Sequence, residues 1–232
     1  MKVALKKQAI KLRESGKTYS EIAATIPVSK ATLSVWLRDI DMPGEYKKKI
    51  IDLRKKAREK GWEARRSDRI DRIARINSTA PVEVSYLMGY PLWLIGLALY
   101  WAEGSKEKSW SKGSLVTLTN MDADAILLFR KWSIRFLSVT SDDFSYSLYV
   151  HDTHTRRSLK IRKWWASVLS VEPELIKIYF KHSKRRHIRH NDGINYMGVF
   201  RLQIKKSVDM NRRISAWTKE VITSLKSLDS VR

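Results

Sequence analysis

Apolar residues recur over residues 1–42 at the spacing of short amphipathic helices. A first helix ends near Gly16, and Thr18 with Glu21 has the capping-box pattern that opens a second helix. Ser29 follows a Pro–Val turn and can cap a third helix. The apolar positions of these helices are Ala4, Ile10, Leu12, Ile22, Ala23, Ile26, Leu33, Trp36 and Leu37. The pattern therefore predicts three short helices, each with a buried side.

Residues 43–80 are rich in helix formers, and their apolar residues again recur at helical spacing. Their charges are mixed but mostly basic. Gly61 is expected to break or bend this helix, and the run "NSTAP" at residues 77–81 is expected to end it. Two interpretations stay open, a helical arm that follows a DNA backbone and a solvated linker helix.

The most apolar stretch is "VSYLMGYPLWLIGLALYWA", residues 84–102, which carries no charge over 19 residues. That length meets the simple criterion for a membrane span. Pro91, however, would break a helix near its middle. The remaining helix, Leu92 to Glu103, would span only about 18 Å, against a hydrocarbon core of about 30 Å. Because both flanks are strongly basic, no orientation in a membrane is favoured either. We therefore expect no membrane partner.

A helix that is apolar on all sides has to bury all sides. The simplest cover for its second side is the same helix of a second copy. Ala98 and Ala102 lie four residues apart, so they form a stripe of small residues that lets two helix backbones approach closely. Two such helices would bring both Glu103 carboxylates together, and these repel unless a cation or a proton lies between them. Mg²⁺, which prefers oxygen ligands, is the natural occupant.

Beyond this helix, alternating stretches separate further helical ones. Strands are expected at 113–120, 143–152, 174–182 and 197–206, with helices at 122–139, 155–169 and 208–225. Alternation gives the sheet one apolar face, covered by helices: Leu118, Tyr146, Leu148, Val150, Ile176, Ile178, Phe180, Phe200, Leu202 and Ile204. Its other face carries Thr117, Thr119, Ser145, Ser147, Tyr149, Lys177, Tyr179, Lys181, Arg201, Gln203 and Lys205.

That second face lacks Asp and Glu, which the solvent face of an antiparallel sheet rarely avoids. Its basic and hydrogen-bonding groups suit a DNA duplex, so its residues are candidate DNA contacts. The ordinary alternative is a half-solvated sheet without a ligand.

Charge gives the strongest indication of a partner. The chain has 46 Lys and Arg against 24 Asp and Glu, a formal net charge of +22. Such an excess favours nucleic acid, because basic side chains neutralise phosphates and release counterions. The chain has no Cys, which excludes disulfides and Cys-type zinc sites and fits a reducing cytoplasm. The first residues have no signal-peptide core, so we expect a cytoplasmic protein.

The run "YSEIAATIPVSKATLSVWL" resembles the helix-turn-helix of resolvase-like and repressor-like DNA-binding domains. The resemblance implies that the N-terminal end of the third helix enters the major groove. It also implies the candidate contacts Ser29, Lys30, Thr32, Ser34 and Arg38, with Ala31 facing outward beside them. Pro27 stands where such turns often carry Gly, so the turn geometry must differ. An ordinary three-helix bundle is the alternative.

The run "GLALYWAEGSK" resembles the motif of the LAGLIDADG homing endonuclease family, and the resemblance covers residues 85–226. It implies that the motif helix forms a dimer interface through Ala98, Leu99 and Ala102. It also implies that Glu103, with Gly104, holds a catalytic divalent metal, and that the polar sheet face lies in the major groove. Gln203 or Lys205 could order the attacking water. Tyr100 and Trp101 depart from the motif. With one motif copy, the chain would need a homodimer and a palindromic or near-palindromic site.

The basic run "KHSKRRHIRHNDG", residues 181–193, connects two strands and is expected to contact phosphates through Arg185, Arg186 and Arg189. Two histidine pairs spaced three apart, His187 with His190 and His151 with His154, also allow a metal site. Neither pair has a Cys or a clear third ligand, so the sequence favours contacts from a basic loop.

The sequence thus predicts an α+β protein. Residues 1–42 form an all-α helix-turn-helix domain, 43–80 a basic helical linker, and 81–232 a LAGLIDADG-like domain. The latter has a mainly antiparallel sheet covered by helices on one face. Two functions stay open: a homodimeric, site-specific, Mg²⁺-dependent endonuclease, and a regulator that binds DNA in the same fold without cutting it.

Overall fold

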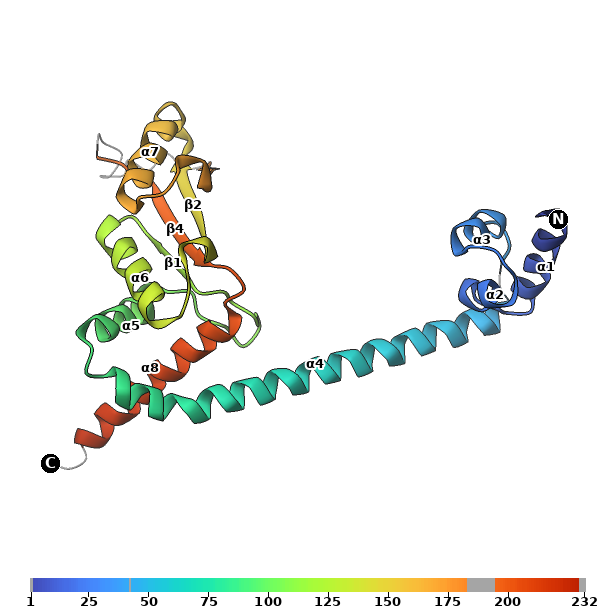
Figure 1. Cartoon of the computed structure of the whole chain (residues 1–232), viewed down its shortest axis with the longest axis horizontal. Helices are drawn as coiled ribbons and strands as arrows, with labels where there is room; N and C mark the ends of the chain where they lie inside the picture. Colours follow the sequence, from blue (N-terminus) through green and yellow to red (C-terminus); the bar gives the residue numbers. More distant parts are fainter. Residues whose placement is uncertain (1, 42, 183–194, 230–232) are drawn as a thin grey trace. The chain divides into compact units, whose positions relative to one another are not determined.

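The computed structural model describes residues 2–41, 43–182 and 195–229. The chain divides into two compact units, Met1–Arg69 and Ile70–Arg232 (Figure 1). Their boundary lies inside one long helix, within the stretch 43–80 that the sequence predicts as a connector.

Three short helices, as expected, begin the first unit: α1 (Lys2–Glu14), α2 (Tyr19–Thr25) and α3 (Lys30–Trp36). The capping box of α2 is present, because the N–H of Thr18 donates to the Glu21 carboxylate at 2.7 Å and the N–H of Glu21 donates to the Thr18 hydroxyl at 3.3 Å. Ser29 caps α3 by accepting the N–H of Thr32 at 3.2 Å. The buried core of this unit consists of Ala9, Ile22, Ile26, Leu33 and Leu37.

The long helix α4 (Gly44–Leu87) continues through both places where the sequence predicts an interruption. The expected break at Gly61 is wrong, since one glycine costs a helix only about 1 kcal/mol relative to alanine. The expected end at residues 77–81 is also wrong, because Pro81 lies inside the helix. Proline removes one backbone hydrogen bond there. Burial of Ala80 and Val84 in the core of the second unit nevertheless stabilises this end of the helix.

Pro91 divides the apolar stretch, as expected: α4 ends at Leu87, and α5 (Pro91–Glu103) begins at the proline. The first position of a helix tolerates proline because the N–H that proline lacks has no helical partner there. Across the described ranges, no helix is long and apolar enough to cross a membrane.

Within the described residues, four strands form one mixed sheet in the order β1-β4-β2-β3. The strands are β1 (Thr117–Asn120), β2 (Phe144–His151), β3 (Ile176–Lys181) and β4 (Val199–Ile204). Strand β4 is antiparallel to both β1 and β2, whereas β3 is parallel to β2. The α+β class and the predominance of antiparallel pairing are therefore confirmed.

Two strand predictions need correction. Strand β1 begins at Thr117 and not at residue 113, because the N–H of Val116 donates to the Ser207 hydroxyl at 2.8 Å and not to a strand. On β3, Phe180 was expected on the buried face but is 43% exposed, since β3 lies at the edge of the sheet.

One face of the sheet packs against the helices of this unit (Figure 1). Helices α5, α6 (Ala123–Phe136) and α7 (Ser158–Leu169) contact the strands, and α8 (Val208–Asp229) packs against α5. The 3-10 turns η1 (Ser141–Asp143), η2 (Asp152–Arg157) and η3 (Pro173–Leu175) lie in the connections. Four tryptophans, Trp93, Trp132, Trp165 and Trp217, are fully buried in this layer. Trp165 stacks on Phe200 of β4, with ring centroids 4.4 Å apart. The opposite face of the sheet is the polar one.

Candidate nucleic-acid interface

The polar face joins residues that are far apart in the sequence. Strand register aligns them in rows: Thr117–Gln203–Ser145, Thr119–Arg201–Ser147–Lys177, Tyr149–Tyr179 and His151–Lys181. Paired residues on neighbouring strands lie about 5 Å apart on the same face, so each row is a continuous line of polar side chains. These strand positions include Arg and Lys but neither Asp nor Glu, so the positive charge of the face is not neutralised within it.

A cationic and aromatic cluster lies in the middle of this face. The rings of Tyr149 and Tyr179 stack with centroids 5.2 Å apart. The guanidinium carbon of Arg201 lies 4.7 Å from the centroid of the Tyr149 ring, and the Lys181 ammonium lies 5.1 Å from it. Arg201 also donates to the Thr119 hydroxyl at 3.3 Å. The basic groups are thus held in fixed positions, and Tyr179 stays 45% exposed.

Two candidate catalytic residues are already bonded within the chain. Gln203 donates to the Thr117 hydroxyl at 2.9 Å, and Thr117 is only 5% exposed. Lys205 lies just beyond β4, and its ammonium donates to the Asp142 carbonyl at 2.7 Å. Because Gln203 and Thr117 bond each other, they contribute less to the accessible polar surface than Thr119, Arg201 and the residues of β2 and β3.

The C-terminal end of α5 is fixed beside β1, at the edge of the sheet. Gly104 forms an antiparallel bridge with Leu118, and the N–H of Ser105 donates to the Thr117 carbonyl at 2.9 Å. A Cβ on Gly104 would lie 2.4 Å from the ring of Tyr100, so this position requires glycine for space. The helix therefore delivers Glu103 to the outer edge of the sheet.

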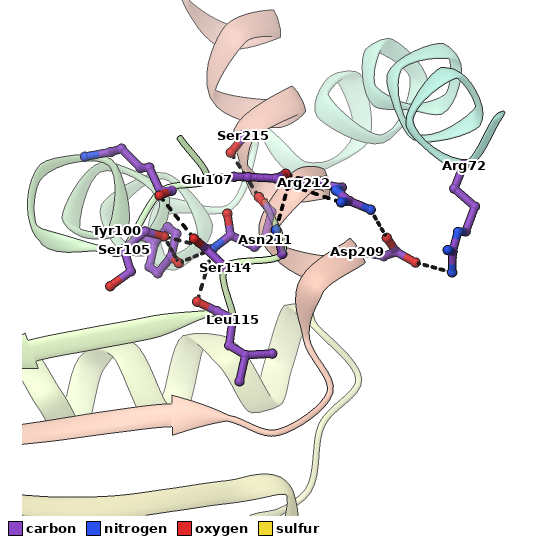
Figure 2. Close-up of polar contacts among 12 residues, drawn as sticks. Arg72, Tyr100, Ser105, Glu107, Ser114, Leu115, Asp209, Asn211, Arg212 and Ser215 are labelled. Carbon is purple, nitrogen blue, oxygen red and sulfur yellow. Dashed lines mark hydrogen bonds and ion pairs between the residues drawn. The ribbon is translucent and has the colours of Figure 1, made fainter. Parts of the chain in front are cut away.

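A buried polar network holds this end in place (Figure 2). Burial raises the pKa of Tyr100 to about 12, so its hydroxyl stays protonated and donates to the Ser105 carbonyl at 2.7 Å. Asn211 of α8 is 1% exposed, and its amide nitrogen lies 3.0 Å from the Tyr100 hydroxyl, 2.8 Å from the Ser105 carbonyl and 3.1 Å from the Leu115 carbonyl. Helix α8 thus fixes the segment that follows Glu103.

The Glu103 side chain is exposed, and its carboxylate makes no hydrogen bond or ion pair with another described residue. It is one carboxylate with the oxygen chemistry that Mg²⁺ prefers. Within the described ranges of one chain, no group of three or more His, Asp or Glu side chains could hold a metal ion. One copy thus offers a single carboxylate ligand at this point, with the Gly104 carbonyl next to it. A complete site would need ligands from outside the chain.

The two sides of α5 differ in their packing. Trp93, Gly96, Leu97 and Tyr100 are buried, and a Cβ on Gly96 would lie 2.1 Å from the ring of Trp132. The close approach of α5 to its own domain therefore occurs at Gly96. The opposite side stays exposed and apolar, and it comprises Leu94, Ile95, Ala98, Trp101 and Ala102. Leu99, the third expected interface residue, is half-buried against the core.

In the first unit, the residues expected to face outward from α3 are mostly exposed. Lys30, Ser34 and Arg38 are exposed, as is Ser29 at the cap. Thr32 is half-buried, and its hydroxyl lies 3.0 Å from that of Ser29, so it takes part in the cap. The accessible side of α3 thus carries Lys30 and Ser34 beside the apolar Ala31 and Val35, and Arg38 is exposed just beyond the helix.

The histidine pairs do not combine into a metal site within the described residues. His151 contacts Asp152 at 2.8 Å, and His182 contacts the second Asp152 oxygen at 3.1 Å. The hydrogen bond from His182 is the main reason why the pKa of Asp152 lies below its usual range. His154 stacks on Tyr196 with centroids 4.4 Å apart. Arg185, Arg186, Arg189, His187 and His190 lie outside the described residues.

The sequence did not predict the ion pairs that hold the segment after Glu103 in place. Glu107 binds Arg212 through two contacts of 3.0 and 3.2 Å, and Arg212 binds Asp209 at 2.8 Å (Figure 2). The bond from Arg212 is the first cause that lowers the pKa of Glu107. The available signal was the single acidic residue, Glu107, within the basic run "SKEKSWSK", because a lone carboxylate at such a position can form an ion pair with a distant basic residue.

No protein-family model matches the chain, and comparisons with curated proteins and with solved structures likewise give no match.

Proposed function

We propose that this protein binds double-stranded DNA as a homodimer and cleaves it with the help of a divalent metal. The observation that carries the proposal is the polar sheet face, where Arg201, Lys177 and Lys181 lie among hydroxyl and aromatic side chains with no strand carboxylate beside them. Such a face can bond phosphates and base edges. The net charge of +22 adds a long-range attraction to any polyanion.

The exposed apolar side of α5 supports the homodimer. Apolar side chains at Ile95 (54% exposed) and Trp101 (55% exposed) gain free energy when they leave water. Ala98 and Ala102 between them are small enough for close helix packing. A second copy packed there would bring two Glu103 carboxylates near one another, with Mg²⁺ between them or beside them. Bound metal would polarise the scissile phosphate and activate water.

The second candidate function is DNA-binding regulation without cleavage. It is favoured by the contacts of Gln203 with Thr117 and of Lys205 with Asp142, because both side chains are already bonded to groups of the chain itself. The three helices of the first unit also suit a regulator if they bind DNA as a helix-turn-helix. Both candidates share the partner, the homodimer and the sheet face, and they differ in what Glu103 does.

Cleavage of a randomised plasmid library in Mg²⁺ distinguishes the two functions. We expect wild type to cut a subset of sites, and Glu103→Gln to bind the same sites without cutting, because the amide loses the charge that holds the metal. Glu172→Gln, which changes another exposed carboxylate, is the matched control and should cut like wild type.

Binding is measured in parallel by fluorescence anisotropy at several salt concentrations. Specific binding without cutting by wild type would reject the nuclease and leave the regulator. Absence of salt-dependent binding would reject both functions, because phosphate contacts make affinity fall steeply with salt.

A further inference from the structure

The connection between α5 and β1 forms a small hairpin, residues 106–114, which we call the tip hairpin. Lys108 and Ser111 exchange both backbone hydrogen bonds, each 3.2 Å long, so Ser109 and Trp110 form a two-residue turn. Trp110 is 81% exposed. A tryptophan at the end of a hydrogen-bonded turn is presented to solvent and contributes little to the core.

The base of the tip hairpin is fixed to α8 (Figure 2). The Glu107 carboxylate binds the Arg212 guanidinium, whose side chain is 9% exposed, and it also accepts the N–H of Gly113 at 2.8 Å. The Ser114 hydroxyl donates to the Lys106 carbonyl at 3.3 Å across the hairpin. Because the base is anchored by a largely buried ion pair, Trp110 is held out in a defined place and not on a free loop.

The charge around Trp110 is positive. Lys106, Lys108 and Lys112 lie within four positions of it in the hairpin, and the Lys108 ammonium lies 5.4 Å from the centroid of the Trp110 ring. Glu107 is the one carboxylate of the hairpin, and Arg212 neutralises it. An exposed aromatic ring among lysines has the chemistry that binds nucleic acid, because bases stack on the ring and phosphates pair with the ammonium groups.

The tip hairpin also begins beside the β1 edge of the sheet, close to the polar face. The bridge of Gly104 with Leu118, and the bond from Ser105 to Thr117, place its start beside β1, the strand next to Arg201 of β4. A duplex that contacts the row of Thr119 and Arg201 would thus have the tip hairpin at its border.

We propose that the tip hairpin is a nucleic-acid contact in which Trp110 stacks on a base and the neighbouring lysines bind phosphates. The inference rests on the proposed DNA binding and adds a residue with its own mode of recognition. Stacking on a base of a duplex requires that one base step opens, so bound duplex is bent there. A single strand offers its bases without that cost, so Trp110 contributes more to binding single strands than to binding duplexes.

The test uses the full-length chain and measures tryptophan fluorescence and affinity with a short duplex and with a single strand of equal length. Trp110→Ala should weaken single-strand binding by about 5- to 150-fold and remove part of the fluorescence quenching. The dependence of its affinity on salt should stay unchanged, because no charge is lost. Lys112→Gln should instead lower the salt slope by about one.

Two control variants lie on α7, in the helix layer: Trp164→Ala and Lys163→Gln, whose side chains are also exposed. Both should bind nucleic acid like wild type. If nucleic acid quenches the tryptophan fluorescence of Trp110→Ala as strongly as that of wild type, and the variant binds with the affinity of wild type, this inference fails while the proposed function stands. If wild type binds no nucleic acid, both fail. A blue shift of the Trp110 fluorescence emission with phosphatidylserine vesicles, together with no quenching of that fluorescence by DNA, would overturn the inference in favour of a lipid surface.

Discussion

At the residue scale, a few buried polar side chains decide where the end of α5 lies. Asn211 and Tyr100 bond the backbone of residues on both sides of the tip hairpin, and Arg212 bonds Glu107. Buried polar groups contribute to stability mainly because leaving one unpaired is costly. Asn211 and Arg212 lie on α8, more than a hundred positions after their partners Tyr100 and Glu107. The placement of Glu103 therefore depends on residues that lie away from it in the sequence.

The pair of Glu107 and Arg212 predicts a pH-dependent loss of stability. Because bonds from Arg212 lower the pKa of Glu107 in the folded state, the charged carboxylate stabilises the fold above its ordinary pKa of 4.5. That contribution is lost as pH falls through the lower, folded-state pKa. We expect Glu107→Gln to reduce the free energy of unfolding by about 1–3 kcal/mol at neutral pH, and by much less in acid.

Urea unfolding followed by circular dichroism at neutral pH and near pH 3 measures this difference. Glu172→Gln, an exposed carboxylate with no ion pair among the described residues, should change stability little at either pH. An equal loss for Glu107→Gln at both pH values would show that the ion pair is not what stabilises the hairpin base.

At the scale of elements, the sheet has two different faces because its strands alternate between buried and accessible positions. Strand β2 alternates without exception from Phe144 to His151, and β4 does so from Val199 to Ile204. The inner residues contact the helix layer, so the outer ones are free to act together. The outer face is therefore where a ligand can approach without disturbing the core.

The polar sheet face predicts that Lys177 contributes to the salt dependence of DNA affinity. This exposed residue of β3 ends the row that contains Arg201, so it should pair with a phosphate of bound duplex. We expect Lys177→Gln to weaken binding by about 3- to 10-fold at low salt and to lower the salt slope by about one. Lys160→Gln on α7 is its matched control. Equal affinities and slopes for the two variants would place the duplex elsewhere on the protein.

At the scale of the whole molecule, the exposed apolar side of α5 is the feature that a single copy leaves uncovered. Leu94, Ile95, Ala98, Trp101 and Ala102 lie on one side of a helix whose other side is fully packed. Pairing of two copies there would place the same surface of each copy against that of the other, which is the geometry of a two-fold interface. It would also give the dimer two equal copies of the polar sheet face.

Ala98→Arg should prevent that pairing, because a large charged side chain replaces the small contact residue. We expect the variant to sediment as a monomer at concentrations where wild type sediments as a dimer. It should also lose most of its affinity for a palindromic site. Leu159→Arg on α7 changes another exposed apolar site, 59% exposed at the leucine, and should leave the dimer intact. A wild-type monomer at high concentration would contradict the proposed homodimer.

The candidate site was predictable where it follows local periodicity. The polar positions of β2 and β4 and the end of α5 at Glu103 were evident from the sequence, because they follow from the pattern of neighbouring residues. The bonds of Gln203 to Thr117 and of Lys205 to Asp142 were not, since strand register and loop geometry decide them. The same holds for Glu107 and its partner Arg212, which are 105 positions apart.

The sequence by itself determined the three short helices of residues 1–42, the alternation of β2 and β4, the caps at Thr18 and Ser29 and the start of α5 at Pro91, because these depend on interactions within a few residues. Tertiary structure alone decided that α4 continues through Pro81, since burial of Ala80 and Val84 outweighs the local cost of proline. It also decided which side of α5 is covered. Gly96 admits the ring of Trp132, so that side packs on its own domain, and the side with Ala98 and Trp101 stays exposed.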